Sequence, residues 1–211
     1  MKPATYILDP EAEVFRIYRR ELVDGTPGNP VWFCDGLKQV CRFDLTGEPG
    51  TCYVSSSPDG AFIEVFQRIG GRGVPYTEVE KRSLARLSVA GEQKALVDLN
   101  VNANLGIMGI DAQLVHETAE GYPRSREFAQ QAFGEGLQGV RWNSLRDLTG
   151  SRVNFALFSR VSGEDEDKIL NIEETEPIPD WLASDIAAEF GVTVLRSPAL
   201  YPIRDVSTVI S

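Results

Sequence analysis

The chain has 211 residues, of which 42% are hydrophobic and 25% charged, a composition typical of a single folded domain. Its formal net charge is −10, with 21 Lys and Arg against 31 Asp and Glu, so direct binding to nucleic acid is not expected. The single histidine, His116, excludes metal sites that need two histidines, and a catalytic triad would have to run through that residue.

Most of the predicted elements are strands. Alternating apolar and polar side chains over residues 13–19 predict the first strand, and a loop rich in Gly and Pro follows at residues 24–30. Residues 102–104 are predicted to form a turn. Short runs of β-branched, aromatic and apolar residues predict further strands at about 39–44, 51–55, 83–89, 94–101, 139–142 and 152–158.

Helices are predicted at three places. Ser57 and Pro58 have the chemistry of an N-cap and a first helical position, and residues 70–73 contain the glycines expected at a helix end. Two more helices are predicted at residues 123–133 and 179–190. The first helix should bury a stripe made of Ala61, Phe62, Val65, Phe66 and Ile69. Strands and helices do not alternate regularly, which predicts an α+β fold with a mixed or antiparallel β core and flanking helices.

Three side chains could together break an N-glycosidic bond in a nucleotide. Arg42, Tyr53 and Glu64 supply a cation for phosphate, a ring for stacking and a carboxylate for a developing positive charge. The sequence also allows a purely structural role for each of these three side chains. Arg42 would pair with a nearby carboxylate, Tyr53 would be a core residue, and Glu64 would pair with Arg68 one turn later.

The sequence lacks the signals of several other kinds of site and segment. No glycine-rich phosphate loop follows a strand and opens a helix, and no run of about 18 apolar residues predicts a membrane span. The N-terminus lacks the apolar stretch of a signal peptide, so we expect a cytoplasmic protein. We expect no metal site and reduced thiols at the three cysteines, which lack zinc-site spacing: Cys34, Cys41 and Cys52.

Three blocks of the chain, taken in order, resemble the RES family, which is named for Arg, Glu and Ser. They are residues 14–18, 42–66 and 122–158. The family is best known for toxins of toxin–antitoxin pairs that degrade NAD, and its core is similar to ADP-ribosyltransferase folds of the diphtheria-toxin kind. The resemblance covers about residues 12–160 of an expected single domain (1–211), and leaves residues 161–211 as a C-terminal extension.

The resemblance also implies roles for individual residues. Glu64 would stabilise positive charge at the ribose C1′, and Arg42 would hold the pyrophosphate. Tyr53 would stack on nicotinamide, and Ser144 would hydrogen-bond ribose or carboxamide. The positions carried over from the family are Arg16, Arg42, Tyr53, Glu64, Ser144 and Arg146.

The resemblance implies a reaction in which NAD is the substrate rather than a prosthetic group. The acceptor of ADP-ribose could be water, inorganic phosphate or a protein side chain. A helix-turn-helix (Xre-like) antitoxin is the implied partner, and a homo-oligomer is left open. Val40–Cys41 replaces the family's usual Gly-Gly and Asp44 its common Asn, which favours the alternative of a catalytically impaired binding module. An unrelated α+β protein is expected instead if Arg42, Tyr53, Glu64 and Ser144 do not line one cleft.

Overall fold

The computed structural model describes residues 3–37, 41–67, 73–108, 114, 117 and 121–196. Ten strands lie in these ranges. They are β1 (Thr5–Leu8), β2 (Glu13–Arg19), β3 (Gly50–Ser55), β4 (Val74–Pro75), β5 (Arg82–Val89), β6 (Lys94–Asp98), β7 (Gly139–Asn143), β8 (Val153–Ser159), β9 (Leu170–Pro177) and β10 (Val194–Leu195).

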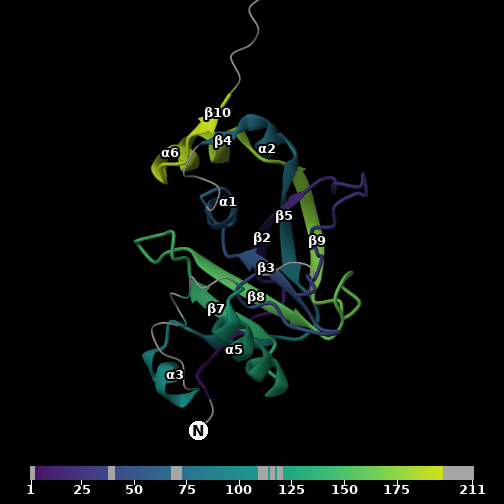
Figure 1. Ribbon diagram of the computed structural model, residues 1–211, viewed down its shortest axis with the longest axis vertical. Coiled ribbons are helices and arrows are strands. Elements are labelled where there is room, and N and C mark those ends of the chain that lie inside the picture. The colour runs from purple at the N-terminus through teal and green to yellow at the C-terminus, as the bar shows by residue number, and fades with distance from the viewer. Residues whose placement is uncertain are drawn as a thin grey trace, which may run out of the picture.

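Eight of these strands form one curved sheet in the order β1-β6-β7-β8-β3-β2-β5-β9 (Figure 1). Every neighbouring pair in it is antiparallel except β6 and β7, which run parallel. Strands β4 and β10 form a separate small parallel pair. The predicted α+β fold with a mixed, mostly antiparallel core is therefore confirmed.

The helices pack at separate places on this framework (Figure 1). Helix α1 (Pro58–Phe66) and a π-helix (Leu182–Ile186) share a core with β2 and β5, and α5 (Pro123–Gly134) shares a second core with β6, β7 and β8. The remaining helices are short: α2 (Tyr76–Glu80), α3 (Asn102–Ile107) and α6 (Ala187–Glu189). Helices α3 and α5 lie at the N-terminal end of the molecule, and α2 and α6 lie at the other.

Most of the predicted elements are present at nearly the predicted bounds, but two predictions are wrong. Residues 41–44 form a turn instead of a strand, because the Asp44 carboxylate accepts a hydrogen bond from the Cys41 backbone N–H at 2.5 Å. Residues 102–104 begin α3 instead of a turn. The predicted last helix is present over residues 180–189, with a π-helical stretch at Leu182–Ile186. Residues 39–40, Arg68, Ile69, residues 70–72 and His116 lie outside the described residues.

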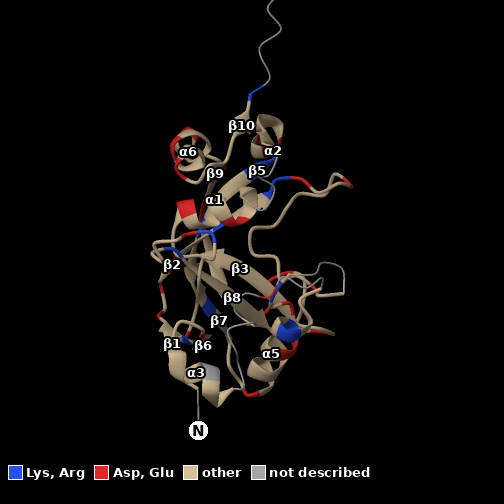
Figure 2. Ribbon diagram, turned by 60° about the vertical axis from the view of Figure 1, so that its left-hand side comes forward, with Lys and Arg blue, Asp and Glu red and all other residues tan. Residues whose placement is uncertain are grey.

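The last long strand, β9, was not predicted, because only its first residue is buried and it shows no apolar alternation. It pairs with β5 at the edge of the main sheet, although it belongs to the region expected to be an extension. Figure 2 shows acidic segments from the α6 end to the α5 end, so the excess negative charge is not confined to one part. None of the helices in the described ranges is long and apolar enough to cross a bilayer.

Candidate functional site

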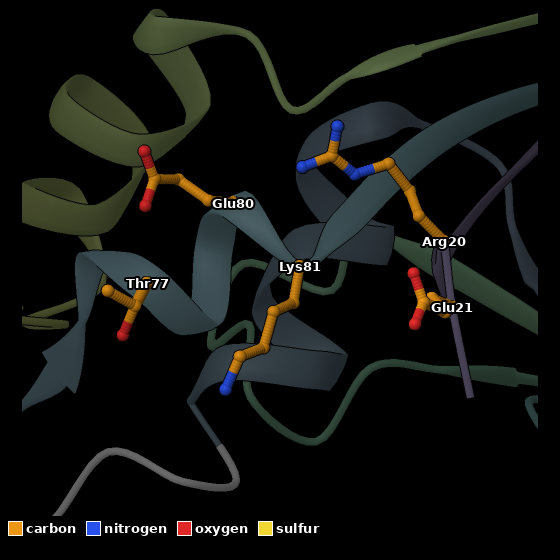
Figure 3. Close-up of a pocket in the computed structure, with 5 residues that line it drawn as sticks. All are labelled: Arg20, Glu21, Thr77, Glu80 and Lys81. Atoms are coloured by element: carbon orange, nitrogen blue, oxygen red, sulfur yellow. The ribbon is translucent and has the colours of Figure 1, made fainter. Parts of the chain in front are cut away.

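Two hollows lined by described residues have a volume that suits a small-molecule ligand. The first, about 500 Å³, is lined by Arg20, Glu21, Thr77, Glu80 and Lys81. Figure 3 shows the side chains of Glu80 and Lys81 pointing in different directions, so the charged groups do not converge on one point. The second hollow, about 600 Å³, is lined by five of the six predicted site residues: Arg16, Arg42, Tyr53, Glu64 and Arg146. It is therefore the candidate site.

Glu64 reaches this pocket from α1. The helix begins as predicted, with the Ser57 hydroxyl accepting from the Gly60 N–H at 3.2 Å and Pro58 in the first turn. Phe62, Ile63 and Phe66 are fully buried on its core side, which turns Glu64 toward the pocket. The Glu64 side chain is 34% exposed, so its carboxylate is accessible to a ligand.

The sixth predicted residue, Ser144, holds the Glu64 carboxylate. The Ser144 hydroxyl donates to Glu64 Oε1 at 2.5 Å, and Ser144 is only 3% exposed. Arg146, two residues later, places its Nε 3.5 Å from Glu64 Oε2. The structure therefore brings all six predicted residues to one place, with Ser144 behind the carboxylate rather than in the pocket wall.

The loop that carries Ser144 is built around Asp147. Its Oδ1 accepts from the backbone N–H and hydroxyl of Thr149, and its Oδ2 accepts from the backbone N–H groups of Ser151 and Arg152. Burial works against the charge of Asp147, but these hydrogen bonds hold its pKa far below the ordinary value. The loop is consequently ordered by its own acceptor, which fixes the position of Ser144.

Arg42 lies across the pocket, near the start of α5. Its guanidinium donates to the Leu114 carbonyl and lies 3.5 Å from the Ser125 hydroxyl. The Glu117 carboxylate accepts from the backbone N–H groups of Arg124 and Ser125 and also lines the pocket. Burial lowers the pKa of Arg42, while the negative charge of Glu117 opposes that shift, so the guanidinium remains a cation.

Tyr53 lines the pocket, and its hydroxyl is hydrogen-bonded within the protein. The hydroxyl donates to Asp44 Oδ1 at 2.9 Å and accepts from the Phe43 N–H at 2.8 Å. Burial, followed by the neighbouring Asp44 charge, raises the pKa of Tyr53 well above its ordinary value, so the phenol stays neutral. The ring packs edge-on to Trp142, with 6.4 Å between centroids. What Tyr53 can offer a ligand is therefore its ring.

Arg16 is also largely committed within the protein. Its Nη1 lies 2.9 Å from each of the Pro30 and Trp32 carbonyl oxygens and from Cys52 Sγ. Burial raises the pKa of the Cys52 thiol, with Arg16 opposing that shift. Cys34 and Cys52 are buried, and Cys41 is half-buried. Among the described residues, no cluster of three or more His, Cys, Asp or Glu side chains could hold a metal ion.

Several residues of the pocket carried no usable signal in the sequence. Trp142 and Asn154 come from β7 and β8, and Glu117 and Tyr122 from the segment before α5. Asn154 donates to Glu64 Oε1 at 2.8 Å. These residues are more than 50 positions from Glu64 in the chain, so only the tertiary fold brings them together.

The arrangement has a definite chemical capacity. The pocket combines a carboxylate fixed by two neutral donors, cations at Arg42 and Arg146, and aromatic rings at Tyr53 and Trp142. A fixed carboxylate stabilises a positive charge that develops next to it, and guanidinium groups bind phosphate oxygens. Stacking surfaces accept a flat base or ring. A ligand with a phosphate, a sugar and an aromatic ring fits this set.

Comparisons with known proteins agree with this description. A family model described as the RES domain matches residues 15–179. A Mycobacterium tuberculosis protein named probable NAD(+) phosphorylase Rv3189 is 33% identical over 84 residues, which cover 39% of this chain and 40% of that protein. The crystal structure of the M. tuberculosis MbcT–MbcA toxin–antitoxin complex contains a chain of the same fold. That chain has a TM-score of 0.62 at 12% identity, with 86% of this chain and 92% of that chain covered.

Proposed function

Because the chain belongs to the RES domain family, we propose that it consumes NAD by cleaving the bond between nicotinamide and ribose. The observation that carries this proposal is the Glu64 carboxylate, fixed at one oxygen and facing a pocket that also contains Arg42. The pocket volume of about 600 Å³ suits a dinucleotide. The name of the M. tuberculosis relative supports the same substrate, although that alignment covers less than half of either chain.

In the proposed reaction the bond between ribose C1′ and the pyridinium nitrogen breaks. Its electron pair neutralises the nitrogen, so nicotinamide leaves as a neutral molecule. Positive charge then develops at C1′ and the ring oxygen. The Glu64 carboxylate stabilises this charge more in the transition state than in the ground state, which lowers the barrier.

The other residues bind and orient the dinucleotide. Arg42 holds the pyrophosphate with its planar guanidinium, and the ring of Tyr53 frames the nicotinamide. Arg16 contributes mainly its positive charge, because its Nη1 already donates to backbone carbonyls. The hydrogen bond from Ser144 to Glu64 favours a role in orienting that carboxylate over the expected contact with ribose.

The acceptor distinguishes two versions of the reaction. Hydrolysis joins a water oxygen to C1′ and releases ADP-ribose and a proton, whereas phosphorolysis joins a phosphate oxygen and releases ADP-ribose 1″-phosphate. The name of the relative favours phosphorolysis. Transfer to a protein side chain is the third outcome, and it would leave ADP-ribose covalently bound to protein.

The test is to incubate the pure protein with NAD, with and without phosphate, and to measure free nicotinamide by chromatography and the second product by mass. Glu64→Gln should reduce release by orders of magnitude without lowering the melting temperature. The matched control is Glu80→Gln, because Glu80 is exposed on α2 and lines the other hollow. Equal rates for Glu64→Gln and wild type would refute the assignment. NAD binding without any release would establish the binding-module alternative.

We further propose that this activity is toxic and is restrained by an antitoxin of the helix-turn-helix type. The support is the shared fold with a chain of a solved toxin–antitoxin complex. Induced expression should arrest bacterial growth and deplete cellular NAD, and Glu64→Gln should abolish both effects. Growth arrest that persists in Glu64→Gln without NAD loss would refute this role.

A further inference from the structure

One residue outside the predicted site contacts the proposed catalytic group directly. Asn154 lies on β8, opposite Ser55 of β3 and Trp142 of β7, in the middle of the main sheet. It is 2% exposed, and its Nδ2 donates to Glu64 Oε1 at 2.8 Å. A strand flanked on both sides cannot shift easily, so this donor has a fixed position.

The contact makes the two carboxylate oxygens unequal. Oε1 of Glu64 accepts from both Asn154 Nδ2 and the Ser144 hydroxyl. Oε2 lies 3.5 Å from Arg146 Nε, a longer and weaker contact. An amide nitrogen can only donate a hydrogen bond, so Asn154 Nδ2 is the donor and Glu64 Oε1 is the acceptor. Oε1 is thereby pinned to the protein, and Oε2 remains the oxygen available to a ligand.

The other end of the same amide indicates why an asparagine is present. Asn154 Oδ1 is buried and has no hydrogen-bond partner among the described residues. A buried acceptor without a partner is unfavourable for stability, and an apolar side chain would avoid it. The benefit of Asn154 to the molecule is therefore the donor that it presents to Glu64.

We propose that Asn154 is a positioning residue for Glu64, fixing Oε1 so that Oε2 faces the ribose of the substrate. This inference rests on the proposed cleavage of NAD. By orienting the Glu64 carboxylate, Asn154 stabilises the transition state of the reaction. The arginines and aromatic rings of the pocket bind the substrate.

The experiment compares Asn154→Ala with wild type for nicotinamide release from NAD and for thermal unfolding. Loss of the donor should lower kcat by about tenfold to a hundredfold while the KM for NAD changes by less than about twofold. The melting temperature should stay equal or rise, because the unpaired acceptor is removed. Asn154→Asp keeps the size but loses the donor, so it should lose at least as much activity. The matched control is Asn171→Ala, on the exposed strand β9.

A double-mutant cycle tests whether Asn154 acts through Glu64. In a Glu64→Ala background, Asn154→Ala should cause no further loss, because the carboxylate that it positions is absent. An equal loss in both backgrounds, or an unchanged kcat for Asn154→Ala beside an active wild type, would overturn the inference and leave the proposed function intact. A fall in melting temperature with full activity per folded molecule would show a purely structural role. A wild type that releases no nicotinamide overturns both proposals.

Discussion

The Ser144 loop depends on a single buried carboxylate, and Asp147→Asn should destabilise it without altering any pocket residue. Asp147 is 6% exposed. Its two oxygens accept five hydrogen bonds: two from Thr149, two from Ser151 and one from the Arg152 N–H. Asparagine has nearly the same size but only one acceptor oxygen, so the comparison isolates the loss of acceptors and charge.

The size of the effect follows from the two ways in which the new amide could lie. If the NH₂ group takes the place of Oδ2, the backbone N–H groups of Ser151 and Arg152 face another donor. If it takes the place of Oδ1, only the backbone N–H of Thr149 faces a donor, because the Thr149 hydroxyl can turn and accept a hydrogen bond from the amide. The second orientation is therefore preferred. An unmatched buried donor costs about 1–3 kcal/mol, and loss of the charge weakens the bonds that remain. We expect about 2–3 kcal/mol in total, and a melting temperature lower by about 4–12 °C.

Thermal unfolding at several pH values provides the assay. The pKa of folded Asp147 lies below its unfolded value of about 4, so its contribution is complete above about pH 4 and is lost as the pH falls further. The gap between wild type and Asp147→Asn should therefore be widest at pH 7 and narrow below pH 4. The control is Asp24→Asn, in an exposed turn where Asp24 accepts from the Thr26 N–H at 3.0 Å; it should change little. A gap of the same size at pH 7 and pH 3 would contradict the reasoning.

Two further predictions concern the walls of the pocket. Arg42→Lys keeps the charge but loses the planar fork, so the KM for NAD should rise by about tenfold with a smaller change in kcat. Steady-state kinetics with Arg20→Lys as the control would test it, and equal KM values would exclude a phosphate contact. Tyr53→Phe removes the hydroxyl between Asp44 and the Phe43 N–H, so calorimetry should show a loss of about 2–3 kcal/mol. Its KM for NAD should change by less than about threefold because the ring remains, and a larger change would show that the hydroxyl contacts the substrate.

Local sequence signals were sufficient for part of the fold and of the site. The start of α1 follows from Ser57 and Pro58. The predicted core stripe of that helix is only partly right, because Ile63 is fully buried whereas Val65 is half-buried and lines the pocket. Ser144 was identified only through family resemblance, because a loop serine has no pattern of its own. Asn154 could not be found locally, because its importance depends on β8 lying next to β3 and on the distance from its amide to α1. Strand β9 was missed because its exposed face carries charged residues instead of an apolar alternation.

The structure also bears on the substitution of Asp44 for the family's common asparagine, which in the sequence suggests a negative charge next to an anionic ligand. Asp44 is 1% exposed, and its carboxylate accepts from the Tyr53 hydroxyl and the Cys41 N–H. Tyr53 lines the pocket, whereas Asp44 is not among the residues that line it. The charge is thus stabilised inside the protein, where it orients the ring of Tyr53. The presence of Asp44 is therefore weaker support for a catalytically impaired site than the sequence alone indicates.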